Sequence, residues 1–189
     1  MAVIAFDPIP EADYQRLALN DPQGVLELHR GRLRERPGMS VEHGDVMELL
    51  LERLYRQLDR GDYRLRVQHA CLRISSDTYY IPDVAVIAVA MSQRLRERPS
   101  SLDAYPGPLP LVVEIWSPST GDYDVNEKLA HYQRRGDQEI WRVHPYERTL
   151  TAWRRQPGGT YAENLFREGW VQSASLSGVT IDLAALFAP

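Results

Sequence analysis

The clearest pattern of hydrophobic and polar positions in this 189-residue chain is a helical one that follows Ser40. Apolar residues recur there at three- and four-residue spacing, which places them on one face of a helix; they are Val46, Leu49, Leu50, Leu54 and Leu58. Ser40 is a good N-cap, and Gly61 is a suitable C-terminal stop. The stretch therefore predicts a long amphipathic helix.

Shorter runs of β-forming residues predict strands before and after this helix. Val25–Arg36 predicts a hairpin that turns at Arg30-Gly31. The other predicted strands are Tyr63–Val67, Ala70–Ser75, Tyr79–Val89, Leu109–Trp116, Glu139–Val143, Leu150–Arg154 and Tyr161–Arg167. Leu109–Trp116 is nearly continuous in apolar residues, which is typical of a central strand covered on both faces.

The remaining segments predict short helices and one long loop. Glu11–Leu19 and Val125–Arg135 are expected to be helical, the second ended by Gly136, and the tail Leu176–Pro189 is expected to pack as a further short helix. Met91–Pro108 is polar and contains three prolines, so we expect a surface loop with at most one helical turn.

The order of these elements predicts the α/β class, with an α+β character: a mixed β-sheet flanked by helices in a single domain. We divide the chain into an N-terminal arm, residues 1–24, and this domain, residues 25–189. A chain of this length can bury a sizeable core without subdivision.

Composition excludes several classes of protein. No apolar run reaches the roughly 18 residues that a membrane span needs, and the N-terminus lacks the basic start of a signal peptide, so we expect a cytoplasmic protein. Cys71 is the only cysteine, which excludes an internal disulfide and a cysteine-cluster zinc site. The net charge of -4 argues weakly against non-specific coating of nucleic acid.

Two carboxylates stand inside apolar runs. Asp83 follows Pro82 in one predicted strand, and Glu114 lies within another. A buried carboxylate needs a partner, which in the structural alternative is an arginine or a set of backbone donors. Neighbouring strands lie about 4.8 Å apart, so two acids at matching heights repel unless a cation or a shared proton lies between them. Two such carboxylates suit Mg²⁺ or Mn²⁺.

A single lysine, Lys128, occurs among the 22 basic residues of the chain. An ammonium near the two acids could hold and deprotonate a water, or stabilise charge on a phosphate. Arginine is a poor substitute as a proton acceptor, because its pKa stays above about 12. The structural alternative is a lysine on an exposed helix face.

Several segments resemble one known family. They are Tyr80–Val86 (YIPDVAV), Leu111–Thr120 (LVVEIWSPST) and the downstream residues Asp124, Lys128, Leu129 and Tyr132. These residues resemble the Uma-type restriction endonucleases of the PD-(D/E)XK nuclease superfamily, over roughly residues 25–155. Glu27–Gly31 and His43 also resemble family positions.

The resemblance implies a restriction-endonuclease-like core and a metal-dependent nuclease that acts on DNA. Asp83 and Glu114 would bind Mg²⁺ or Mn²⁺, with the backbone carbonyl of Ile115 as a further ligand, and Lys128 would complete the catalytic set. One departure stands out: the superfamily lysine normally lies two residues after the second acid, where this chain has Trp116. Lys128 would replace it from the following helix.

Other residues have two interpretations each. His43 could reach the metal or a phosphate, or make only a local hydrogen bond. Several aromatic residues near the site could stack on bases, although packing is the commoner role; they are Tyr79, Tyr80, Tyr105, Trp116 and Tyr123. Arg94, Arg96 and Arg98 form a basic run that could steer phosphate or simply be solvated.

The sequence therefore supports two main hypotheses. The first is a metal-dependent DNA endonuclease with DNA as its partner. A homodimer is compatible with this reading, since nucleases of the superfamily often pair to act on two strands. The alternative is a catalytically inactive module of the same fold that binds nucleic acid or a protein partner. An enzyme for another phosphate-bearing substrate is a weaker third reading.

Overall fold

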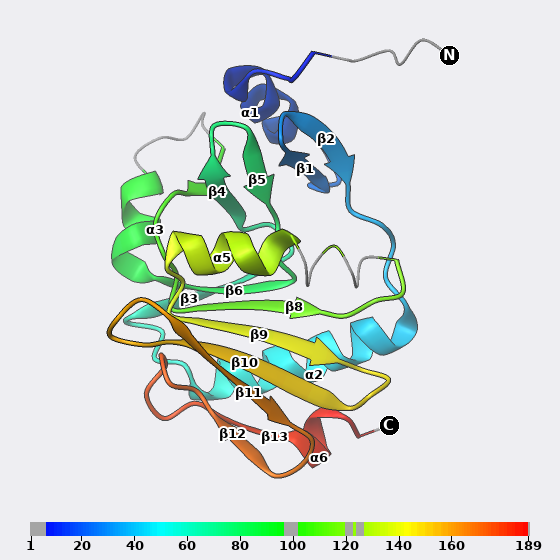
Figure 1. Cartoon of the computed structure of the whole chain (residues 1–189), viewed down its shortest axis with the longest axis vertical. Helices are drawn as coiled ribbons and strands as arrows, with labels where there is room; N and C mark the ends of the chain where they lie inside the picture. Colours follow the sequence, from blue (N-terminus) through cyan, green and yellow to red (C-terminus); the bar gives the residue numbers. More distant parts are fainter. Residues whose placement is uncertain (1–6, 97–101, 120–122, 124–126, 189) are drawn as a thin grey trace.

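A six-stranded mixed sheet forms the middle layer of the structure (Figure 1). The structure is a computed structural model that describes residues 7–96, 102–119, 123 and 127–188. In spatial order the strands of this sheet are β11 (Tyr161–Phe166), β10 (Thr149–Arg155), β9 (Glu139–His144), β8 (Leu111–Ile115), β6 (Val84–Ala88) and β3 (Tyr63–Val67). β8 and β9 are parallel, whereas the other neighbouring pairs are antiparallel. The predicted mixed α/β domain is confirmed.

A smaller sheet and a two-stranded ribbon flank this layer. The smaller sheet has the order β2 (Arg32–Glu35), β1 (Leu26–His29), β5 (Thr78–Tyr80), β4 (Cys71–Ser75) and β7 (Ala104–Tyr105). The ribbon pairs β12 (Trp170–Gln172) with β13 (Thr180–Asp182). The helices are α1 (Glu11–Leu19), α2 (Val41–Gln57), α3 (Val89–Arg96), α5 (Leu129–Arg135) and α6 (Leu183–Leu186).

Alternation along the central strands divides the interior into two cores. Val84 and Val86 of β6 face a core that contains the apolar stripe of α2, whereas Ala85 and Ile87 face the core beneath α5 and the smaller sheet. β8 alternates in the same way and is buried at every position, as predicted for a central strand. The face beneath α5 is the one on which the site forms.

The predicted strand Tyr79–Val89 is wrong in one important respect, because it is two strands. β5 ends at Tyr80 and belongs to the smaller sheet, while β6 begins at Val84 and belongs to the larger one. Pro82 lies between them, and a proline cannot donate to a strand ladder. The chain therefore passes from one sheet to the other just before Asp83.

The predicted loop Met91–Pro108 and the predicted helical tail also need correction. α3 extends over Val89–Arg96, more than one helical turn, and the loop contains the short strand β7. The tail first forms β13 and only then the four-residue helix α6. These short strands depend on pairing with other strands: β7 pairs with β4, which is distant in sequence, and β13 pairs with the preceding strand β12.

The helix boundaries follow the predicted caps in part. Ser40 accepts a hydrogen bond from the N–H of His43 at the start of α2, as an N-cap does. α2 ends at Gln57, before the predicted stop at Gly61. Gly136 caps α5 in the left-handed conformation, φ 84°, as predicted. The predicted start of this helix at Val125 lies outside the described residues.

α1 packs against the smaller sheet through Tyr14, whose side chain is fully buried and whose hydroxyl donates to the carbonyl of Leu26. Glu11 accepts two hydrogen bonds from Arg73 of β4. Among the described residues, no helix is long and apolar enough to span a membrane.

Candidate active site

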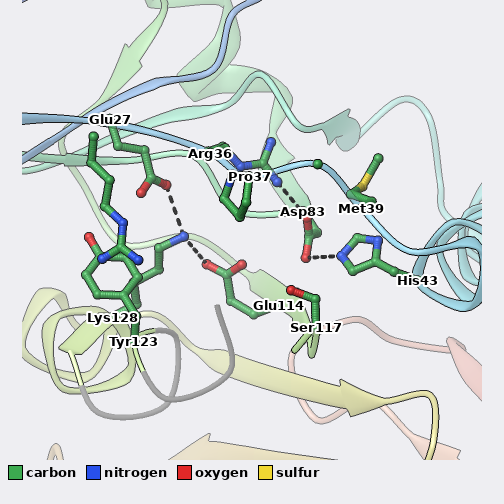
Figure 2. A pocket seen from close by; sticks show the side chains of 12 residues that line it. Glu27, Arg36, Pro37, Met39, His43, Asp83, Glu114, Ser117, Tyr123 and Lys128 are labelled. Atoms are coloured by element: carbon green, nitrogen blue, oxygen red, sulfur yellow. Dashed lines mark hydrogen bonds and ion pairs between the residues drawn. The ribbon is translucent and has the colours of Figure 1, made fainter. Parts of the chain in front are cut away.

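Asp83 and Glu114 lie next to each other where β6 begins and β8 ends. Val84 pairs with Val113 in the antiparallel ladder, so Asp83 and Glu114 occupy the next pair of opposite positions and lie on the same face of the sheet. Both line one pocket, together with Lys128 and His43 (Figure 2). The structure therefore brings together the four side chains that the sequence singled out.

Asp83 is buried and accepts three hydrogen bonds. Its Oδ1 accepts from the Arg36 guanidinium at 2.6 Å, and its Oδ2 accepts from His43 Nε2 at 3.0 Å and from the N–H of Ile115 at 2.8 Å (Figure 2). Burial alone would raise the pKa of Asp83. The His43 hydrogen bond, the charges of His43 and Arg36 and the Ile115 N–H outweigh that effect, so the pKa of Asp83 lies below its ordinary value.

Lys128 lies between two carboxylates (Figure 2). Its Nζ is 3.0 Å from Glu27 Oε1 and 3.3 Å from Glu114 Oε1, and its side chain is only 5% exposed. The hydroxyl of Tyr132 on α5 donates to the same Glu114 oxygen at 2.6 Å. This arrangement excludes the structural alternative of a lysine on an exposed helix face.

Glu27 is a site residue that the sequence reasoning did not assign. It is 2% exposed, and its Oε1 also accepts from the N–H of Ile81 at 2.7 Å. The available signal was an acid between Leu26 and Leu28 in a predicted strand, which is the same signal that marked Glu114. Arg36, at the end of the same hairpin, was missed as well.

The pocket is small and mainly polar. It has a volume of about 30 Å³, enough for one or two water-sized groups. The Arg34 guanidinium lies 3.5 Å from the ring centre of Tyr123, and both residues line the pocket. The pKa of Tyr123 is raised to about 12, chiefly by burial.

Comparison with known proteins shows which family shares this architecture. The family model described as "Putative restriction endonuclease", Uma2, matches residues 11–184. The chain belongs to the Uma2 family. A solved structure described as a putative nuclease from Anabaena variabilis shares the fold, with 18% sequence identity, a TM-score of 0.75, and coverage of 95% of this chain and 98% of that chain. No curated protein matches the chain.

Trp116 lies two residues after Glu114, where the resemblance drawn from the sequence leads us to expect a lysine, but its ring is engaged elsewhere. It stacks on His144, with ring centres 4.3 Å apart, and meets Tyr146 edge-on. Lys128 instead reaches the Uma2 pocket from the residue before α5. The Lys128 ammonium and the two acids therefore come together through the tertiary structure, and not because they occupy nearby positions on one strand.

The residues at this Uma2 site fit a hard divalent cation by their donor chemistry. Mg²⁺ and Mn²⁺ prefer carboxylate and carbonyl oxygens, and Asp83, Glu114 and Glu27 provide carboxylates around the pocket. Within the described residues, no three His, Cys, Asp or Glu side chains are grouped at metal-binding spacing. Arg36 pairs with Asp83, and Lys128 pairs with Glu27 and Glu114. A metal would have to exchange with these cationic partners.

His43 contacts Asp83 directly, so its role is more than a local helix-start hydrogen bond. Its Nδ1 is buried and has no hydrogen-bond partner in the described part of the chain. Such an unsatisfied buried nitrogen is rare in proteins. Ile115 contacts Asp83 through its backbone N–H. A role of the Ile115 carbonyl as a metal ligand stays a prediction.

The remaining predicted positions lie away from the pocket or inside the core. Tyr79, Tyr80 and Tyr105 are fully buried, so packing is their role in this structure. Arg94 and Arg96 lie on α3 and do not line the pocket. Arg98, together with the motif residues Thr120 and Asp124, lies outside the described residues.

Proposed function

We propose that this protein is a metal-dependent DNA endonuclease that hydrolyses phosphodiester bonds. One observation carries the proposal: Asp83, Glu114 and Lys128 converge on one recessed polar pocket although they come from separate elements. These residues are only 3%, 6% and 4% exposed, and each of them takes part in an ion pair there, at a desolvation cost that packing alone does not require. Membership of the Uma2 family supports the same chemistry.

Asp83 and Glu114 would hold Mg²⁺ or Mn²⁺, with the Ile115 carbonyl as a further ligand, and the ion would polarise the phosphoryl group. Around them, Arg36 and His43 keep Asp83 ionised and fix its orientation. These hydrogen bonds hold the Asp83 carboxylate, in its ionised form, at the pocket wall.

Lys128 donates from Nζ to a phosphate oxygen or to the attacking water in this proposal. Its ammonium stabilises charge that develops on the phosphate, in a recess where water screens little. Glu27 positions the amine from the opposite side, and Tyr132 positions the Glu114 carboxylate. A tethered ammonium of this kind contributes through correct placement before the reaction begins.

The deciding experiment compares wild type with Lys128→Ala. Both proteins are titrated with Mn²⁺ by calorimetry and incubated with plasmid and single-stranded DNA in Mg²⁺ or Mn²⁺. We expect both to bind Mn²⁺, while cleavage by the variant falls by about 10²–10⁴-fold because a positioned proton-transfer and charge-stabilising group is lost. Arg167→Ala, at an exposed position between β11 and β12, should leave cleavage unchanged.

Two results would decide against the nuclease. If purified wild type cleaves no form of DNA with either metal, the activity is absent. If neither protein binds Mn²⁺, Asp83 and Glu114 are structural acids held by their present partners.

A second candidate function is a catalytically inactive module that binds nucleic acid or a protein partner. It is favoured by one observation: both oxygens of Asp83 already accept hydrogen bonds, from Arg36, His43 and Ile115. In that case binding of DNA or of the partner survives Asp83→Asn, whereas a nuclease loses cleavage with this substitution.

A further inference from the structure

Four arginines occupy every second position from residue 30 to residue 36, which includes the turn and the second strand of the β1–β2 hairpin. They are Arg30, Arg32, Arg34 and Arg36, and we refer to them as the arginine stripe. The hairpin turns at Arg30 and Gly31, which both have positive φ, 50° and 75°. This two-residue turn matches the natural twist of paired strands and fixes the register.

The register places the stripe on the face that bears the site. Successive side chains of a strand point to opposite faces, so Arg32 and Arg34 share one face of β2. Arg34 is the direct cross-strand partner of Glu27, whose carboxylate enters the pocket. On the other face, Leu33 pairs with Leu28, which packs in the core beside Tyr14.

The contacts of the stripe lead outward from the pocket. Arg36 binds Asp83 inside it, and Arg34 lies at its lining against the ring of Tyr123. Arg32 is exposed. Arg30, whose side chain is 66% exposed, pairs with Glu127 at 3.0 Å, next to Lys128 in the sequence. A line of guanidinium groups thus starts at the acids and continues to the surface.

Protection of a free sheet edge does not explain this arrangement. β2 is the outer strand of its sheet, and charged side chains on such a strand discourage addition of another strand. That purpose is served by any exposed charge. Edge protection requires neither the Arg34 guanidinium 3.5 Å from the centre of an aromatic ring nor a stripe that ends at the carboxylates.

We propose that Arg34, Arg32 and Arg30 bind consecutive phosphates of the nucleic-acid strand on one side of the bond that is cleaved. This inference rests on the proposed function, and it specifies how the substrate strand leaves the pocket. Arginine matches phosphate oxygens with two parallel donors, and contact with an aromatic ring restricts the guanidinium before the phosphate arrives. The local positive charge contrasts with the net charge of -4 of the whole chain.

The spacing of the stripe suits this ligand. Two residues of a strand advance about 6.6–6.8 Å, which is close to the separation of neighbouring phosphates in an extended nucleic-acid strand. Arg32 and Arg34 can therefore each meet a phosphate without a change in the strand, and Arg30 continues the stripe from the turn once it exchanges Glu127 for a phosphate. Sequence-independent contacts of this kind position a strand and make binding dependent on salt.

The test measures binding of a fluorescent single-stranded oligothymidylate in EDTA, over a series of salt concentrations. Loss of one phosphate contact lowers the slope of log K against log salt by about 0.7. We expect that decrease for Arg32→Gln and about twice as much for the Arg30→Gln, Arg32→Gln double variant. Arg167→Gln, at an exposed position between β11 and β12, is the matched control and should keep the wild-type slope.

Cleavage measured in parallel separates this inference from the proposed function. If wild type cleaves DNA but Arg32→Gln retains the slope of Arg167→Gln, the stripe is not a phosphate site and the proposed nuclease function is unaffected. If the salt slope of the variants falls as expected although wild type cleaves no DNA, the stripe binds nucleic acid and the proposed endonuclease function is wrong. If wild type does not bind the oligonucleotide even at low salt, the inference is overturned.

Discussion

Glu114 and Glu139 are buried acids on neighbouring parallel strands, yet their surroundings differ. Glu139, fully buried at the start of β9, accepts from Arg154 Nε, from the hydroxyl of Ser173 and from the N–H groups of Ala174 and Ser175. These donors lie on a neighbouring strand and on the loop between β12 and β13. Glu139 therefore attaches the C-terminal ribbon to the main sheet.

Within the described part of the chain, Glu114 contacts the Tyr132 hydroxyl on α5 and the Lys128 ammonium beside it, and it faces a pocket. Side-chain partners can move away, whereas backbone N–H groups of a packed loop cannot do so without unfolding the loop. The comparison teaches that burial alone does not distinguish a functional acid from a structural one. These two glutamates differ instead in that Glu114 faces a pocket, whereas Glu139 is also held by the N–H groups of a packed loop.

The largest expected effect comes from removing the charge at the pocket. Glu114→Gln should lower DNA cleavage by about 10³-fold, because a ligand of the divalent cation and the partner of Lys128 are both weakened. Its thermal midpoint should stay near that of wild type, since Tyr132 can still donate to the amide oxygen. Cleavage rates and differential scanning calorimetry measure the two quantities, with the exposed Glu168→Gln as control.

The opposite outcome is expected for Glu139→Gln. Breaking a buried charged network by changing one partner costs about 3–5 kcal/mol, so urea unfolding should show a large loss of stability. Cleavage per folded molecule should not change. Full stability of this variant, or loss of cleavage while it remains folded, would remove the distinction between the two glutamates.

The smallest effect concerns pH, where Asp83 and Asp137 should behave in opposite ways. Burial raises the pKa of Asp137, although Arg135 and the Leu109 N–H oppose it, whereas the pKa of Asp83 is lowered. In the unfolded chain both should have a pKa of about 3.9. Asp83 therefore adds stability above about pH 4 that is lost on acidification, and Asp137 costs stability as pH rises above that value.

Thermal midpoints from about pH 3 to 6, in EDTA, should show this difference between the two aspartates. With rising pH, wild type should gain stability relative to Asp83→Asn and lose it relative to Asp137→Asn. The expected changes are a few degrees. Parallel behaviour of the two variants would show that both aspartates have the same kind of environment.

Much of the site could be predicted from the sequence because its acids break a strong local pattern. Glu114 is conspicuous inside an apolar strand, and Asp83 follows a proline at the edge of another. Glu27 carries the same signal between Leu26 and Leu28, but its strand has only four residues, so the apolar run around it is short. The break of the chain at Pro82 was visible too, but its meaning depends on the presence of two sheets.

Local patterns determined the helices, most strands and the identity of the acids and the lysine, because periodicity and capping act over a few residues. Only the tertiary structure decided which partners balance those charges. Arg36 meets Asp83 across 47 residues, and Glu27 holds the Ile81 N–H across 54. Such contacts depend on how the hairpin of the smaller sheet lies over the larger one, and no local spacing encodes that arrangement.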